Sequence, residues 1–213
     1  MRNHKKNKSK KIWICKKNKL KSDDSDDESD EEENGVVVSG NHIYFYSDVS
    51  IKPIRQLNQI INNLNEPGKR YPEIWIHINS YGGTIYDALS AVDTINASQT
   101  PIITLIEGMC ASAATMISIA GDMRYIRPNG VLLIHQMRCG VFGKKEDVDD
   151  EIENIKNLED KLINLYVDNS KLTKVSFKKI MKREMEFSAE KCLEFGFVDD
   201  IYTGRDTLGK RKR

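Results

Sequence analysis

Residues 108–120 read Gly-Met-Cys-Ala-Ser-Ala-Ala-Thr-Met-Ile-Ser-Ile-Ala, a small and apolar run with the hydroxyl of Ser112 near its front. The residues before it, 101–106, have the apolar character of a short buried strand, and Gly108 allows a tight turn. The residues behind Ser112 favour a helix buried on all sides, so this serine is expected at a junction between a strand and a helix. Free backbone N–H groups at such a junction stabilise a developing oxyanion, which suits a nucleophile. A serine among alanines is also a common packing residue, and this run alone leaves both interpretations open.

The length and composition predict one globular domain. The chain has 213 residues, of which 39% are hydrophobic and 31% charged, and its formal net charge is +1. This length is enough for one sizeable core, and the balanced charge predicts no particular affinity for nucleic acid. The cysteines are scattered, without a C-x-x-C pair to hold zinc, which favours free thiols and no bound metal; they are Cys15, Cys110, Cys139 and Cys192.

Runs of charge mark both ends of the chain. Residues 1–21 are rich in lysine, and residues 23–33 are almost wholly acidic apart from serines. Blocks of like charge repel themselves and bury nothing. We therefore predict a disordered charged tail at 1–35, a folded domain at 36–204 and a basic tail at 205–213. A solubilising role is the expectation for the lysines, with nuclear targeting or nucleic-acid binding as the alternative.

The sequence predicts neither a membrane span nor an organellar address. The N-terminus lacks the apolar segment of a signal peptide, and its acidic block differs from the acid-poor presequences of mitochondria and plastids. The one apolar run of membrane length, 102–120, contains Glu107 and several hydroxyl residues, which favours a buried strand, turn and helix. We expect the cytoplasm or another reducing compartment.

Predicted strands and helices alternate along the folded region. Strands are predicted at 36–38, 42–46, 74–79, 101–106, 123–126, 131–134 and 197–202. Helices are predicted from apolar spacing at 54–64, 87–95, 108–120, 146–167, 177–182 and 188–195. This alternation implies right-handed crossovers and an α/β fold with a mainly parallel sheet.

Three short segments are expected to meet at one edge of that sheet. Gly82-Gly83, Ser112 and His135 each come directly after a predicted strand. Sites in open parallel sheets lie beyond the carboxyl ends of the strands. The three segments are therefore expected to converge on one site.

A serine nucleophile needs a base within hydrogen-bond reach, a group that orients the base, and donors for the oxyanion. Histidine is the usual base, and the chain has four. His4 lies in the charged tail, His42 opens a strand, and His77 lies mid-strand, where a structural histidine is the usual finding. His135 lies on the same edge as Ser112. Its position fits either a general base or a residue that fills the end of a strand.

Several motifs in the folded region resemble, in order and spacing, those of the Clp protease proteolytic subunit (ClpP). They are Ile-Asn-Ser-Tyr-Gly-Gly at 78–83, Gly-Met-Cys-Ala-Ser-Ala-Ala at 108–114, Leu-Ile-His-Gln at 133–136, Phe-Ser-Ala-Glu at 187–190 and Phe-Gly-Phe-Val-Asp at 195–199. The resemblance extends over roughly residues 42–203. Each motif alone is weak evidence, whereas the set in register is specific.

The resemblance implies the ClpP/crotonase fold, with repeated ββα units and a mainly parallel sheet. It implies Ser112 as nucleophile, His135 as general base, and the backbone N–H groups of Gly83 and Ala113 as the oxyanion hole. It also implies that a glycine-flanked segment lies near the strand that pairs with the substrate peptide. That segment is Gly140, Val141, Phe142 and Gly143.

The resemblance also implies an assembly. The long helix at 146–167 corresponds to the protruding handle through which two seven-membered rings of this family stack around their active sites. Unfolded polypeptides would be the substrate, and a partner AAA+ ATPase of the unfoldase type would feed them in. The chain itself would need no cofactor, because only the partner would use ATP.

The third catalytic residue departs from the family pattern. The family normally has an aspartate four positions before a serine or threonine, and counting back from Ser188 gives Glu184. Glu186 is the alternative if the register slips. His77 stands where the family has an aromatic residue associated with ATPase docking.

The leading hypothesis is a serine endopeptidase that works inside a ring chamber, with Glu184 orienting His135. The first alternative is a non-catalytic subunit of the same fold that mixes with active subunits, which the glutamate departure motivates. The second is a crotonase-like acyl-CoA lyase or isomerase, because that fold also uses two backbone donors on a thioester oxyanion.

Overall fold

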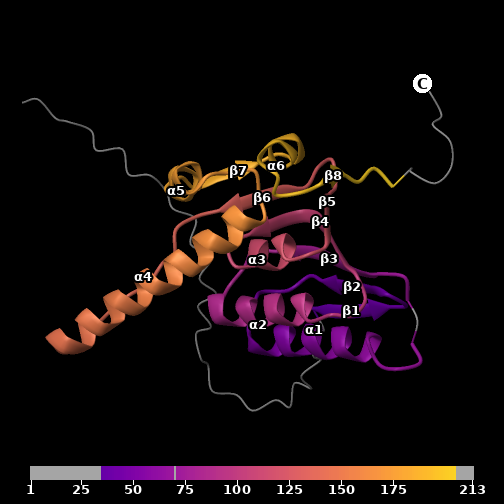
Figure 1. Ribbon diagram of the computed structural model, residues 1–213, viewed down its shortest axis with the longest axis horizontal. Helices are drawn as coiled ribbons and strands as arrows, with labels where there is room; N and C mark the ends of the chain where they lie inside the picture. The colour runs from indigo at the N-terminus through magenta and orange to yellow at the C-terminus, as the bar shows by residue number, and fades with distance from the viewer. Residues whose placement is uncertain (1–34, 70, 205–213) are drawn as a thin grey trace, which may run out of the picture. The chain divides into compact units, whose positions relative to one another are not determined.

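A computed structural model of the chain describes residues 35–69 and 71–204, which form one eight-stranded sheet with helices packed against it (Figure 1). Neighbouring strands follow the order β1-β2-β3-β4-β5-β8, while β6 pairs with β4 and β7 pairs with β6. The predicted tails lie outside the described residues, apart from residue 35. The strands are β1 (Val36–Ser39), β2 (His42–Phe45), β3 (Ile74–Ser80), β4 (Ile102–Ala111), β5 (Met123–Ile126), β6 (Val131–Ile134), β7 (Met185–Phe187) and β8 (Asp200–Ile201).

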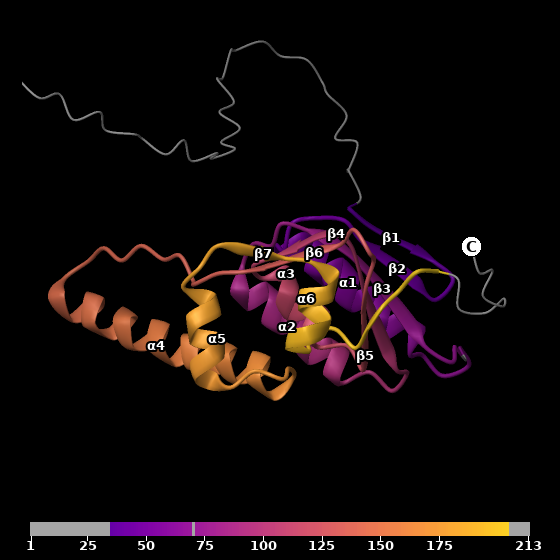
Figure 2. The ribbon, with the colours of Figure 1, turned by 90° about the horizontal axis from the view of Figure 1, so that it is seen from above.

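The sheet is mainly parallel, which confirms the predicted α/β class. Strands β2, β3, β4, β5 and β8 pair in parallel, as do β4 and β6, whereas β1 and β7 run antiparallel to their neighbours. The crossover helices α1 (Ile51–Leu64) and α2 (Ile85–Asn96) lie side by side (Figures 1 and 2). Alternation in β3 buries Ile74, Ile76 and Ile78 completely in the core.

Strand β4 is longer than predicted. The expected turn at Gly108 is wrong, because β4 continues to Ala111. The buried helix predicted behind Ser112 is confirmed as α3, but it covers only Ala114–Ile119 and not the whole of 108–120. Gly108 adopts a positive φ of 90° inside the strand, and the Asn79 side-chain oxygen accepts the next N–H, that of Met109, at 3.1 Å. Gly108 thus forms part of a β-bulge. Before the bulge β4 pairs with β5, and after it β4 pairs with β6.

The C-terminal third matches the predictions except at two strands. Helices α4 (Lys145–Asp168), α5 (Lys174–Met181) and α6 (Ala189–Phe195) form close to the predicted positions, and β7 was not predicted. Strand β8 is shorter than the predicted 197–202, because the Phe197 N–H bonds back to the Cys192 carbonyl of α6.

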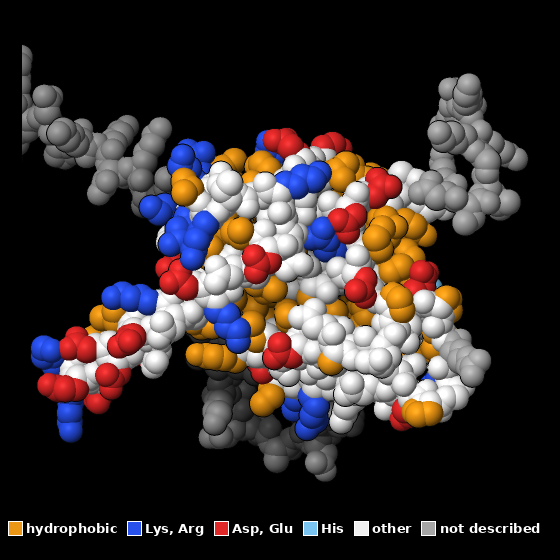
Figure 3. Space-filling model, in the orientation of Figure 1, with side chains coloured by type: hydrophobic (Ala, Val, Ile, Leu, Met, Phe, Trp, Pro, Cys, Tyr) orange, Lys and Arg blue, Asp and Glu red, His pale blue; other side chains and the backbone are white. Residues whose placement is uncertain are grey.

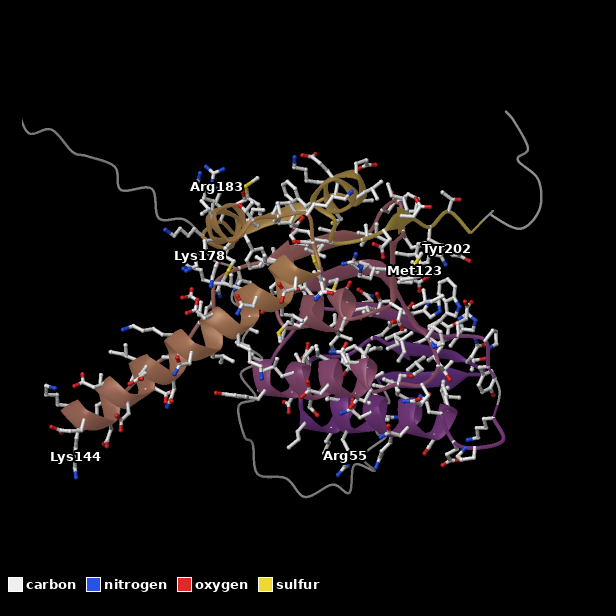
Figure 4. All side chains as sticks on the ribbon, viewed as in Figure 1. Arg55, Met123, Lys144, Lys178, Arg183 and Tyr202 are labelled. Carbon is white, nitrogen blue, oxygen red and sulfur yellow. The ribbon has the colours of Figure 1, made fainter. Side chains whose placement is uncertain are left out.

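Helix α4 packs through its C-terminal end alone. Its buried residues are Leu162, Ile163 and Tyr166, and the helix runs outward from there to Lys145, beside the labelled Lys144 (Figures 1 and 4). Acidic and basic side chains mix along the outward part (Figure 3). Within the described ranges, none of the helices has both the length and the apolar character that a bilayer crossing requires.

His77 is a structural histidine in the sheet. The residue is 6% exposed, and its ring stacks on the Tyr44 ring at 4.4 Å between centroids. One ring nitrogen lies 2.9 Å from His42 Nδ1, and the other lies 3.2 Å from the carboxylate of Glu107. That carboxylate also accepts hydrogen bonds from Tyr46 and Arg127.

Candidate active site

Ser112 lies at the sharp junction between β4 and α3. Its φ of 53° is the only positive value at a non-glycine residue in the described ranges. Its N–H donates to the Leu133 carbonyl of β6 at 2.8 Å, and its own carbonyl accepts the Thr115 N–H at 3.0 Å. A left-handed residue held between a strand and a helix presents its side chain outward, as a nucleophile requires.

The Gly82-Gly83 turn passes directly beside this junction. A Cβ atom on Gly82 would lie 2.7 Å from the Ser112 Cβ, and one on Gly83 would lie 2.1 Å from the Val49 carbonyl oxygen. Both positions therefore need glycine. The N–H groups of Gly83 and Ala113 donate no hydrogen bond within the described residues, so both are free to bind an oxyanion.

The tautomer of His135 follows from its one hydrogen bond. Nδ1 lies 2.6 Å from the backbone oxygen of Gln136, and a carbonyl oxygen can only accept. The proton of the neutral ring therefore lies on Nδ1, and Nε2 keeps the lone pair that a general base uses. No hydrogen bond joins His135 to the Ser112 hydroxyl in the part of the chain that the structure describes.

A single pocket brings these groups together. Gly83, Ser112, Ala113 and His135 all line a cavity of about 300 Å³. The apolar part of its wall comes largely from α3, α4 and α5, as Met116, Leu162, Tyr166 and Met181. The pocket therefore combines a hydroxyl, an imidazole and free amides with room for an apolar side chain.

Strand β7 places Glu184 beside His135. The β6–β7 register pairs Ile134 with Met185, and His135 and Glu184 are the next residues of the two segments. Glu186 instead pairs with Leu133, two pairs away from the histidine. The register thus favours Glu184 over Glu186 as the third residue.

The Glu184 carboxylate is engaged elsewhere in this structure. It accepts a hydrogen bond from the guanidinium of Arg138 and forms an ion pair with it. This contact, with a smaller contribution from His135, lowers the pKa of Glu184 below its ordinary value. The predicted contact between Glu184 and His135 is not formed here, because the Gln136 carbonyl occupies Nδ1.

Comparison with known proteins identifies the family. A family model described as Clp protease matches residues 32–205. The chain belongs to the Clp protease family. It is 35% identical over 135 residues to the "ATP-dependent Clp protease proteolytic subunit" of Leuconostoc citreum, covering 62% of this chain and 68% of that protein. It is 30% identical over 131 residues to the protein of the same name from Deinococcus radiodurans, covering 61% and 64% of the two chains. The family predicted from the motifs is thereby confirmed.

The segment predicted to lie near a substrate strand is exposed in this Clp protease family member. Residues 140–143 belong to the connection between β6 and α4, and Phe142 is fully exposed. They do not line the pocket around Ser112. Their role in substrate binding stays a prediction.

Sequence reasoning missed two residues of this Clp protease site. Arg138 lines the pocket and binds Glu184. The sequence indication that could have identified it is its position three residues after His135. Tyr166 lines the pocket from α4, and the apolar stripe of that helix gave no hint that a hydroxyl in it faces Thr115.

Proposed function

We propose that this chain is a serine endopeptidase, the proteolytic subunit of an ATP-dependent Clp-type protease. The observation that carries this proposal is the convergence of Ser112, His135, Gly83 and Ala113 on one pocket. Family membership supports the same activity.

The first half of the reaction acylates Ser112. His135 Nε2 takes the hydroxyl proton while Oγ attacks the peptide carbonyl carbon, and the carbonyl oxygen becomes an oxyanion. The free N–H groups of Gly83 and Ala113 donate to that oxyanion. The C–N bond then breaks, and the imidazolium gives its proton to the leaving amine.

The second half releases the acyl group. A water molecule gives a proton to His135 and attacks the ester carbon, and the proton then returns to Ser112 Oγ as the new carboxyl product leaves. Nδ1 keeps its proton throughout. Turning the Glu184 carboxylate from Arg138 to Nδ1–H would stabilise the imidazolium by charge, which the Gln136 carbonyl cannot do to the same degree.

The proposed substrates are unfolded polypeptides. The pocket accepts an apolar side chain, and the exposed segment 140–143 offers backbone groups for an extended peptide. We assign the chain to stacked seven-membered rings joined through α4, with an ATP-dependent unfoldase as supplier. The length of α4 exposed in the single chain supports this assembly.

Covalent labelling tests the nucleophile. A fluorophosphonate should label the wild-type protein, and Ser112→Ala should abolish both labelling and peptide hydrolysis. Ser118→Ala is the matched control, because Ser118 is a buried serine of helix α3, which follows Ser112, and lies outside the pocket. Unchanged labelling of Ser112→Ala would overturn the assignment. If the pure protein is not labelled but joins rings with an active subunit, the non-catalytic role is favoured. Binding of a CoA thioester would favour the acyl-CoA role.

A further inference from the structure

The backbone of Ser112 needs support from its surroundings. An L-residue at a φ of 53° crowds its Cβ against the following carbonyl, so the conformation persists only where neighbouring contacts impose it. One such contact is the N–H donated to Leu133. The other contacts are made to the Ser112 carbonyl oxygen.

Thr115 holds that carbonyl oxygen twice. Its backbone N–H donates at 3.0 Å, and its hydroxyl Oγ1 donates at 2.6 Å. The hydroxyl of Tyr166 lies 2.6 Å from the same Oγ1. Since Thr115 has one hydroxyl proton and gives it to Ser112, Tyr166 must be the donor to Thr115. The hydrogen bonds therefore run in one direction, from Tyr166 through Thr115 to Ser112.

Packing and burial fix the position of Tyr166, the first donor in this series of hydrogen bonds. Tyr166 is 6% exposed, and its ring stacks on Phe177 of α5 at 4.7 Å between centroids. Thr115 is 1% exposed, so water does not compete for either hydroxyl. Burial raises the pKa of Tyr166, so its hydroxyl stays protonated and remains a donor at physiological pH.

We propose that Tyr166 and Thr115 are positioning residues for the nucleophile, an inference that rests on the proposed function of Ser112. The tyrosine hydroxyl fixes the threonine rotor, and the threonine hydroxyl fixes the peptide plane between Ser112 and Ala113. That plane carries the oxyanion-hole N–H of Ala113 and sets the direction of Ser112 Oγ. A residue of α4, 51 positions away from Thr115, thereby determines the geometry of the reacting groups.

Conservative variants test this inference through the rate of fluorophosphonate labelling and through kcat. Tyr166→Phe keeps the stacked ring and removes one neutral buried hydrogen bond, so labelling and kcat should fall roughly fivefold. KM for a short peptide should stay within about twofold, because the ring face that lines the pocket remains. Thr115→Val also removes the bond to Ser112 and should slow both rates by about 10- to 100-fold. Thr115→Ser keeps the hydroxyl and should restore near wild-type rates.

The double variant and a control separate positioning from stability. In Thr115→Val the tyrosine hydroxyl has lost its acceptor, so adding Tyr166→Phe should slow labelling no further. Tyr125→Phe, a tyrosine on β5 outside the pocket, should label at the wild-type rate. Melting temperatures are measured in parallel, and rates are taken below the first transition. If Thr115→Val does not fold, Tyr166→Phe and Thr115→Ser still decide.

Failure of the inference differs from failure of the proposed function. A wild-type protein whose Ser112 is never labelled would remove both. A labelled wild type, with Tyr166→Phe and Thr115→Val reacting at the same rate despite lower melting temperatures, would leave the protease intact. That result would show that the hydroxyls of Tyr166 and Thr115 contribute only to stability, and the positioning role would be overturned.

Discussion

His135 and Glu184 stand next to each other at the ends of two paired strands, one residue beyond the pair of Ile134 and Met185. Residues opposite each other in an antiparallel pair have Cβ atoms about 5 Å apart, which a carboxylate side chain spans. Glu184→Gln should therefore lower kcat/KM by about 100-fold or more, because an amide stabilises the imidazolium poorly. The matched variant Glu186→Gln should stay within about twofold, and peptide hydrolysis measures both. Equal losses of kcat/KM in the two variants would contradict the assignment of Glu184, rather than Glu186, as the partner of His135.

Arg138 binds the Glu184 carboxylate that the proposed mechanism assigns to His135. Both members of the ion pair are exposed, at 72% and 62% of their side chains, so solvent screening leaves only a weak attraction between them. Arg138→Met should thus raise kcat, by no more than about fivefold. Arg183→Met, beside Glu184 but without an ion pair to it among the described residues, serves as control (Figure 4). In the Glu184→Gln background Arg138→Met should change nothing, and a gain there would contradict competition for Glu184.

The folded state should lose stability in mild acid because of His77. Burial lowers the pKa of this imidazole, and the nearby Glu107 carboxylate offsets the effect only in part. Below about pH 6.5 the unfolded chain takes up a proton that the folded chain refuses, so the melting temperature should fall between about pH 7 and pH 5. His77→Phe keeps an aromatic ring beside Tyr44 and removes the titration. An equally steep fall in that variant would show that another group is responsible.

Gly83 should tolerate no side chain. A Cβ there would lie 2.1 Å from the Val49 oxygen, which accepts the Thr84 N–H at 2.8 Å. Gly83→Ala should therefore move the turn, lower stability by about 2 kcal/mol or more and abolish peptidase activity. Gly40→Asn is the control, because Gly40 has open space and a left-handed φ of 60° that asparagine accepts. Denaturant melts and peptide hydrolysis report the two effects, and a Gly83→Ala variant with unchanged stability and activity would show that the turn accommodates a Cβ atom.

The periodic spacing of apolar residues predicted most of the helices and strands. Helix α1 and strands β3, β5 and β6 form where apolar spacing predicted them, since burial of one face leaves a local pattern in the sequence. Strand β7 left no such pattern, because only Phe187 of its residues is buried. Gly108 was expected to form a turn and instead forms a bulge. The cause is a long-range contact, the hydrogen bond from the Met109 N–H to the Asn79 side chain, which the local sequence does not reveal.

The sequence predicted which residues at strand ends meet in the candidate site, but not the side-chain contacts that hold them there. Ser112, His135 and Gly83 follow strands in the sequence, and parallel strands deliver their ends to one edge. The partners that hold these groups are distant in the chain: Arg138 is 46 residues from Glu184, and Thr115 is 51 residues from Tyr166. Such contacts depend on the packing of α4 and β7, which local patterns do not contain.

The change of partner along β4 bears on biosynthesis. Ser112 is synthesised before β6, yet its N–H is held by the Leu133 carbonyl, and the final turns of α4 follow later still. A nascent chain that has emerged only to α3 therefore has the serine without the frame that shapes it. Peptidase activity is therefore expected only after β6 and the final turns of α4 have left the ribosome, and a chain that terminates before them should be inactive.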